Sequence, residues 1–146
     1  MQRVDQARLV ADGMPQDEMG PGLLVLVGIQ DQDDEAVMHY MVQKIATLRI
    51  FTDAEGHMNI SARDLGYGLY LVPNFTLYGD CRHGRRPSFF ASSRPETAEK
   101  IFEKLVETAR REAGIPVHTG VFQTHMVIET TLDGPVTLLI DSDKMF

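Results

Sequence analysis

Cysteine and long apolar runs are nearly absent from this sequence. Cys81 is the only cysteine among 146 residues, so no internal disulfide can form, and a reducing compartment such as the cytoplasm is the natural setting. The longest apolar stretch, Leu23 to Ile29, is far shorter than the ~20 residues that cross a bilayer. No charged and then apolar leader opens the chain. We therefore expect a cytoplasmic protein without membrane association.

Positive charge is also scarce. Lysine and arginine number 14 against 21 aspartates and glutamates, which gives a formal net charge of −7. This balance argues against indiscriminate binding to nucleic acid, DNA included, because phosphate contacts need clustered cations. An RNA site must therefore be local, and the candidate is the run formed by Arg82, His83, Arg85 and Arg86. The alternative is that this run is a solvated loop.

Several catalytic signatures are missing as well. The five histidines have no metal-ligand spacing, and Cys81 has no cysteine partner, so we expect neither a metal nor a cofactor. Neither a G-x-S-x-G nucleophile elbow nor a phosphate-binding glycine loop is present. The acidic run from Asp31 to Glu35 is interpreted as the start of a helix, where carboxylates are favourable.

The apolar patterns that remain predict strands and two helices. The expected strands cover residues 23–29, 69–72, 117–122, 126–131 and 136–140, with a Gly-Pro turn between the last two. One helix follows the acidic run, and a second begins at Ser93 or Glu96 and stops near Gly114. The faces expected to be buried are Val37, Tyr40, Met41, Ile45 and Leu48 in the first helix, and Ala98, Ile101, Phe102, Leu105, Val106 and Ala109 in the second.

These elements fit one compact α+β domain over residues 1–146. Neither an internal repeat nor a linker divides the chain. Short strands combined with two amphipathic helices predict a mixed or antiparallel sheet covered by the two helices.

Two short segments carry the most specific information, Pro73-Asn74-Phe75-Thr76-Leu77 and Asp133-Gly134-Pro135-Val136-Thr137. Each lies at the edge of an apolar run, and Gly-Pro favours a tight or cis turn. Thr76 is a poor nucleophile unaided, because the sequence places no base beside it. The backbone N–H groups of Phe75 and Thr76, if directed outward, would stabilise a developing oxyanion instead. The plain structural alternative is that Thr76 pairs or caps a strand.

Together with residues 84–89, these segments resemble the D-aminoacyl-tRNA deacylase family. The matches run nearly end to end: Gln2-Arg3-Val4, residues 20–26, Lys44-Ile45, residues 48–51, Met58-Asn59, residues 75–78, residues 84–89, residues 119–122 and residues 134–137. The resemblance implies a barrel-like homodimer with its active site at the subunit interface. It also implies hydrolysis of the ester of D-aminoacyl-tRNA, a proofreading step of translation, with glycyl-tRNA as an additional candidate substrate.

The resemblance also assigns roles to residues. Gly134 and Pro135 correspond to a Gly-cis-Pro element that reaches into the other subunit's pocket and excludes L-amino acids. The site residues that it implies are Asn74, Phe75 and Thr76 for catalysis, Arg3 for holding the Gly-Pro loop, Phe122 and Met126 for the terminal adenosine, and Arg82, Arg85 and Arg86 for the tRNA. We favour a positioning role for Thr76, because an aminoacyl ester is already activated and carries its own vicinal ribose hydroxyl.

Departures from the family pattern leave alternatives open. Pro73-Asn74 stands where the family has Ser-Gln, and Pro73 is similar to an animal paralogue with altered substrate choice. Gln123-Thr124-His125 replaces the usual Gly-Ala pair. The alternatives are a paralogue with altered specificity, a catalytically weak RNA-binding or interaction module, and a relative of the editing domain of archaeal threonyl-tRNA synthetases. Phe75-Thr76-Leu77 disfavours the last of these.

Overall fold

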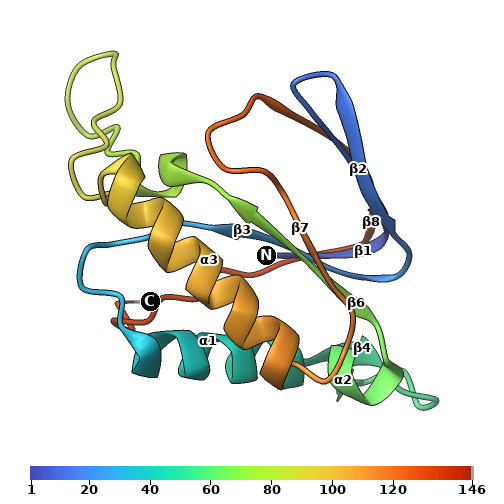
Figure 1. The fold of residues 1–146 in the computed structure, drawn as a ribbon. Helices are drawn as coiled ribbons and strands as arrows, with labels where there is room; N and C mark the ends of the chain where they lie inside the picture. Colours follow the sequence, from blue (N-terminus) through green and yellow to red (C-terminus); the bar gives the residue numbers. More distant parts are fainter. Residues whose placement is uncertain (146) are drawn as a thin grey trace.

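The computed structural model describes residues 1–145, so Phe146 lies outside the described part. Figure 1 shows strands wrapped into one curved layer, with helices packed on one side of it. In chain order the elements are β1 (Gln2–Ala11), β2 (Met14–Met19), β3 (Gly22–Val27), α1 (Glu35–Thr47), β4 (Arg49–Thr52), β5 (Met58–Ser61), α2 (Ala62–Leu65), β6 (Gly68–Pro73), the 3-10 helix η1 (Phe75–Tyr78), α3 (Pro95–Glu112), β7 (Val117–Thr119) and β8 (Met126–Thr137).

The main sheet is mixed, as predicted. Its order is β2-β1-β3-β6-β7, with β8 on the other edge of β1. Strand β1 is antiparallel to β2, β3 and β8, whereas β3, β6 and β7 run parallel. Strands β2 and β3 follow one another along the same edge of β1, and the Tyr70 hydroxyl of β6 donates to the Asp17 carbonyl of β2 at 2.9 Å. The result is the nearly closed, barrel-like sheet that the family resemblance implied.

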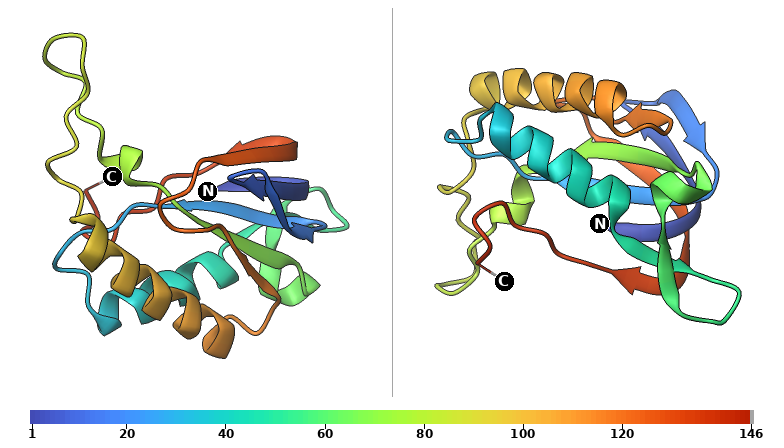
Figure 2. Two further views of the ribbon diagram at one scale, coloured as in Figure 1. Left: turned by 45° about the horizontal axis from the view of Figure 1, so that its top comes forward. Right: turned by 90° about the horizontal axis from the view of Figure 1, so that it is seen from below.

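Strands β3 and β6 are buried on both faces, which explains their continuous apolar sequences. Leu23 and Leu69 face the helices and join the larger core. Leu24 and Tyr70 point to the opposite face and join a smaller core with residues of β1. Helices α1 and α3 lie side by side over the first of these faces (Figure 2). Strands β3 and β6 therefore form the buried centre of the sheet, and the first motif begins where β6 ends.

The two predicted long helices are present, but the buried face of α1 differs from the prediction. Its buried residues are Met38, Val42, Ile45 and Ala46. Of the predicted face, Ile45 is buried, Val37, Met41 and Leu48 are only half-buried, and Tyr40 is exposed. Apolar residues cover a wide part of this helix surface, so their spacing is compatible with burial of either of two neighbouring faces. The predicted face of α3 is confirmed, with all six residues buried or half-buried.

A third, short helix corrects the prediction of two. Helix α2 is a single turn that starts at Ser61, whose hydroxyl accepts from the Asp64 N–H while the Asp64 carboxylate accepts from the Ser61 N–H. It ends at Gly66, which adopts the left-handed conformation with φ +67°. A helix of one turn is too short to produce a detectable apolar period.

The strands at the two ends of the chain also differ from the prediction. The hairpin of β1 and β2 was not predicted, although its turn at Asp12-Gly13 has positive φ at both positions, as Asp-Gly hairpins do. The predicted strands 126–131 and 136–140 are one strand, β8, and Gly134-Pro135 lies inside it rather than in a turn. The register of the pairing between β8 and β1 shifts on both sides of Val4, and these shifts accommodate Gly134-Pro135 within the strand. The strand predicted over 117–122 ends at Thr119.

Candidate active site

The first motif begins where β6 leaves the sheet. The Asn74 N–H donates to the Val27 carbonyl at 2.7 Å, which extends the pairing of β6 with β3 by one residue. The chain then turns into η1. The Asn74 side-chain carbonyl accepts from the Thr76 hydroxyl at 2.6 Å and from the Thr76 N–H at 3.3 Å. Asn74 is therefore the cap of η1 and the direct partner of Thr76, a link that sequence reasoning missed.

This link limits what Thr76 can do chemically. Its hydroxyl proton is donated to an amide oxygen, which is far too weak a base to generate an alkoxide. Its N–H faces Asn74, so the expected pair of outward N–H donors is reduced to one. The Phe75 N–H is at the first position of η1, where no carbonyl of the same helix can accept it. The arrangement suits positioning and oxyanion stabilisation, and it does not suit nucleophilic attack.

The aromatic ring of Phe75 is exposed and contacts the loop that follows. It packs edge-on against Phe89, with 5.0 Å between ring centroids. On the other side, Tyr78 lies over Gly28, where an added Cβ would be 2.8 Å from the Tyr78 ring. Burial raises the pKa of the Tyr78 hydroxyl. Contacts on both sides thus hold η1 at the sheet edge.

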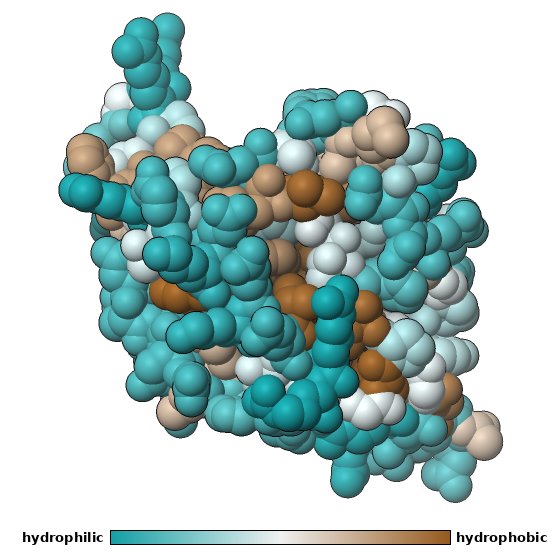
Figure 3. Space-filling model, in the orientation of Figure 1, coloured by the Kyte–Doolittle hydropathy of each residue, from teal (hydrophilic) through white to brown (hydrophobic). Residues whose placement is uncertain are grey.

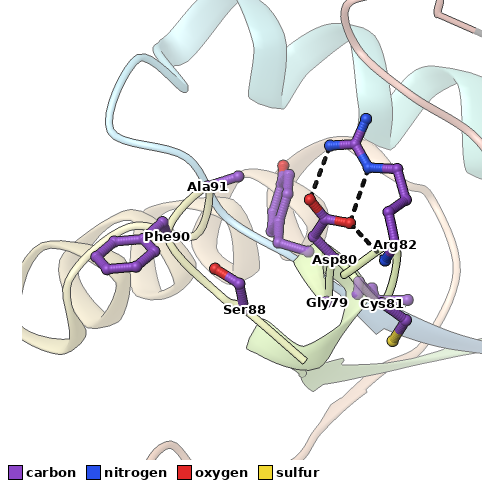
Figure 4. Close-up of a pocket in the computed structure, with 9 residues that line it drawn as sticks. Gly79, Asp80, Cys81, Arg82, Ser88, Phe90 and Ala91 are labelled. Atoms are coloured by element: carbon purple, nitrogen blue, oxygen red, sulfur yellow. Dashed lines mark hydrogen bonds and ion pairs between the residues drawn. The ribbon is translucent and has the colours of Figure 1, made fainter. Parts of the chain in front are cut away.

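The cationic run lies on the loop from Asp80 to Ser88, whose ends pair through their backbones at 2.8 and 2.9 Å. Arg82 binds Asp80 through two guanidinium nitrogens at 2.8 and 2.7 Å (Figure 4). These hydrogen bonds lower the pKa of Asp80 to about 2. The Arg82 side chain is thus bound within its own loop. Arg85 and Arg86 are exposed and have no ion-pair partner within residues 1–145.

The second motif is anchored by Arg3. The Gly134-Pro135 bond is cis. Arg3 is only 8% exposed. Its Nη1 donates to the Ile50 carbonyl at 2.7 Å, and its Nε lies 2.7 Å from Asp133 Oδ2, close enough for an ion pair although not aligned for a hydrogen bond. The guanidinium therefore connects β4 to the residue that precedes Gly134.

The two motifs do not meet within one chain. Gly134 lies on β8, which pairs with β1, whereas Thr76 follows β6, and β1 and β3 run between them. Three strand spacings amount to about 14 Å along the sheet. Thr76 lies beyond the paired end of β6 at Pro73, whereas Gly134 lies level with Arg3 and Leu23. The two motifs therefore do not form one contiguous site within a single chain.

Phe122 lies in the segment after β7, and Met126 is the first residue of β8. Between them and β6, Gly120 approaches so closely that an added Cβ would be 3.3 Å from the Pro73 ring and 2.8 Å from the Met126 sulfur. Phe122 is half-buried and faces Phe102 of α3 at 6.4 Å. Gly120 and the Met126 sulfur therefore lie near Pro73, the residue before Asn74, whereas the Phe122 ring packs toward α3.

Residues 123–125, which depart from the family pattern, fix this loop in place. Gln123 has a positive φ of 55°. The Thr124 hydroxyl donates to the Val121 carbonyl at 2.9 Å. The His125 N–H donates to the Asp12 carboxylate at 2.9 Å, and the Asp12 N–H donates back to the His125 carbonyl at 2.9 Å. The replacement segment is thus tied to the β1–β2 turn.

Comparison with known proteins identifies the family. The family model described as D-Tyr-tRNA(Tyr) deacylase matches residues 1–141. The chain belongs to this deacylase family. A D-aminoacyl-tRNA deacylase of Symbiobacterium thermophilum is 49% identical over 146 residues, which is all of this chain and 96% of the relative. One of Desulfitobacterium hafniense is 50% identical over all of this chain and 97% of the relative.

A solved structure supports the same fold for the deacylase. It is described as c-Myc DNA Unwinding Element Binding Protein, is 32% identical, and covers 94% of this chain and 93% of its own, with a TM-score of 0.85. The resemblance stated from sequence is thereby confirmed, and so is the prediction of a hydrolase of the D-aminoacyl-tRNA deacylase class. Within residues 1–145, no helix of the deacylase is long and apolar enough to cross a bilayer.

Proposed function

We propose that two copies of this chain form a deacylase that hydrolyses the ester of D-aminoacyl-tRNA in the cytoplasm, releasing the D-amino acid and intact tRNA. The observation that carries the proposal is the Asn74–Thr76 contact beside the Phe75 N–H at the start of η1. It forms a surface that can hold an ester carbonyl but offers no nucleophile. Catalytic amounts of the protein should release D-tyrosine from D-Tyr-tRNA. Failure to release it would contradict the proposal.

The chemistry then needs only water and the substrate's own hydroxyl. Water attacks the carbonyl carbon, and the Phe75 N–H stabilises the resulting oxyanion. The vicinal ribose hydroxyl accepts the proton that water loses and passes its own proton to the departing ribose oxygen. The bond between that oxygen and the carbonyl carbon breaks, and the free acid leaves. The protein contributes orientation and a fixed dipole, which can account for most of the rate enhancement for an activated ester.

Thr76→Ala is expected to retain measurable activity. Loss of the hydroxyl removes one hydrogen bond to Asn74, which corresponds to ~1–3 kcal/mol of positioning. Single-turnover hydrolysis of D-Tyr-tRNA measures the effect, and Thr76→Ser, which keeps the hydroxyl, is the matched control. A nucleophile would behave differently, because its loss costs several orders of magnitude in rate. An acyl group trapped on Thr76 of the parent protein would overturn the positioning role.

The enzyme is expected to be an obligate homodimer, because the two motifs are separated within one chain. Strand β8 supports a subunit contact: within the described residues it pairs only with β1, and it leaves a long sheet edge. Val127, Leu132 and Leu139 are exposed along this strand and just beyond it. Light scattering at micromolar concentration should give twice the chain mass of 16.4 kDa. A stable, fully active monomer would refute the shared site.

Arg85 and Arg86 are expected to provide much of the attraction for tRNA. Replacing both with alanine should weaken binding and lower the slope of log affinity against log salt by about 1.5, because fewer counterions are released. The control is Lys100→Ala with Lys104→Ala, which removes the same charge from the exposed face of α3. Binding is measured with uncharged tRNA at several salt concentrations. Equal slopes for the parent and the arginine variant would place the RNA contact elsewhere.

A further inference from the structure

Phe90 is an exposed aromatic residue that folding does not explain. Its side chain is 100% exposed. It lies between Ser88, at the closed end of the cationic loop, and the start of α3. Single exposed apolar residues are common on protein surfaces, so the case for a contact with another molecule depends on what surrounds Phe90.

The segment around Phe90 is held firmly on both sides. The preceding Phe89 packs against Phe75 of the first motif. After it, the Ser92 N–H donates to the Phe89 carbonyl at 3.1 Å, and the Ser93 N–H donates to the Ile29 carbonyl at 2.9 Å. Figure 4 shows the Phe90 ring directed away from the Asp80–Arg82 pair. The backbone on both sides of Phe90 is therefore held in place, and Phe89 connects it to the candidate active site.

The loop that precedes Phe90 carries positive charge, although the whole protein is acidic. Arg82 neutralises Asp80 at the base of the loop, which leaves the charges of Arg85 and Arg86 uncompensated among residues 1–145. In Figure 3 the loop projects at the upper left as a hydrophilic column with more apolar surface at its base. An open depression of about 770 Å³ lies beside it, lined by Leu77, Asp80, Ser88 and Phe90 among others. The depression thus adjoins the loop that carries Arg85 and Arg86, and an exposed aromatic residue next to a cationic loop fits single-stranded nucleic acid.

We propose that Phe90 stacks on an unpaired base of the tRNA acceptor end, next to the terminal adenosine, while Arg85 and Arg86 hold the adjoining phosphates. The proposal rests on the function proposed above and adds to it a contact outside the reacting nucleotide. A flat ring accepts any base because every base has an aromatic face. The two arginines supply the charge complementarity that an apolar protein partner would not require. Phe90 is thus a positioning residue, which holds the strand so that the ester reaches Asn74 and Thr76.

The test uses the full-length protein and uncharged tRNA with 2-aminopurine at one unpaired position before the terminal adenosine. The parent protein should quench the probe, because stacking on an aromatic ring quenches 2-aminopurine. Phe90→Ala and Phe90→Leu should lose the quenching and bind about 5- to 100-fold more weakly. Phe90→Trp should retain both the quenching and the affinity. Met14→Ala, which removes an exposed apolar side chain from the start of β2, is the matched control and should behave like the parent.

Rates of hydrolysis distinguish the contact between Phe90 and the tRNA from the cleavage of the ester. The loss in kcat/KM caused by Phe90→Ala should be larger for D-Tyr-tRNA than for a D-tyrosyl ester of adenosine alone, which lacks the neighbouring nucleotides. Equal losses on both substrates, or parent-like quenching by Phe90→Ala, would overturn the proposal. So would a change of oligomeric state with unchanged tRNA binding, since Phe90 would then belong to a protein interface. Quenching by a parent protein that fails to hydrolyse D-Tyr-tRNA would contradict the proposed function and leave this contact standing.

Discussion

The deacylase should hydrolyse D-Tyr-tRNA and leave L-Tyr-tRNA intact, and Gly134→Ala should lose this activity or this discrimination. Gly134 has φ +120°, which L side chains rarely adopt, and an added Cβ would lie 2.9 Å from both the backbone nitrogen and a side-chain carbon of Val136. Such strain costs ~1–3 kcal/mol and must move the Gly-Pro backbone. A displacement of that element should lower the rate on the D ester by about 10- to 100-fold.

The measurement compares single-turnover hydrolysis of D-Tyr-, L-Tyr- and Gly-tRNA by the parent protein and the variant. Gly56→Ala is the matched control, because Gly56 also has a positive φ of +87° but nothing within 4 Å of an added Cβ. It should lose some stability and keep the preference for the D ester. Equal parent rates on D and L esters would contradict rejection by backbone shape. A parent preference for Gly-tRNA over D-Tyr-tRNA would favour the paralogue with altered specificity.

Arg3→Ala is expected to give the largest loss of stability together with a loss of activity. The substitution leaves the Ile50 carbonyl without its donor and opens a cavity beside Phe51, over whose ring the guanidinium lies at 5.8 Å. The ion pair with Asp133 adds less, because that carboxylate is 41% exposed and solvent screens it. We expect a decrease of ~2–4 kcal/mol in the free energy of unfolding.

Arg8→Ala tests the specificity of this effect. Arg8 is on the same strand, but its side chain is 54% exposed and its distance to Glu129 is 3.9 Å. Loss of such a surface pair should change the free energy of unfolding by less than ~0.5 kcal/mol. Chemical denaturation measures both variants, and single-turnover hydrolysis of D-Tyr-tRNA follows activity. Similar losses in the two variants would mean that Arg3 does not hold the Gly-Pro segment.

The parts of the fold that follow local rules could be predicted from the sequence. The uninterrupted apolar runs of β3 and β6 indicated strands, and the spacing of Ala98, Phe102 and Val106 indicated α3 and its buried side. Periodicity was less decisive in α1, where Met38 and Val42 are buried although Val37 and Met41 had been predicted. The face chosen there depends on contacts with α3, which a single helix's sequence does not contain.

The sequence predicted a set of site residues but not their arrangement. Family resemblance placed Arg3 beside the Gly-Pro segment and Thr76 at a strand end. It did not indicate that Asn74 accepts the Thr76 hydroxyl proton, although an asparagine two residues before a threonine at a strand end is a known turn pattern. Nor did it indicate that Arg82 is occupied by Asp80. These contacts depend on side-chain geometry in the loop. Residue spacing alone does not determine which partner each side chain contacts.

The separation of the two motifs along the sheet has a genetic consequence. A chain altered at Asn74 and Thr76 together and a chain altered at Gly134 should each hydrolyse the D ester poorly alone, yet they should recover activity when they are expressed together. In a mixed dimer, the intact first motif of one chain meets the intact second motif of the other. Random pairing of equal amounts would leave about a quarter of the sites intact. Two recessive alleles of this gene would therefore complement each other, although each encodes a defective enzyme.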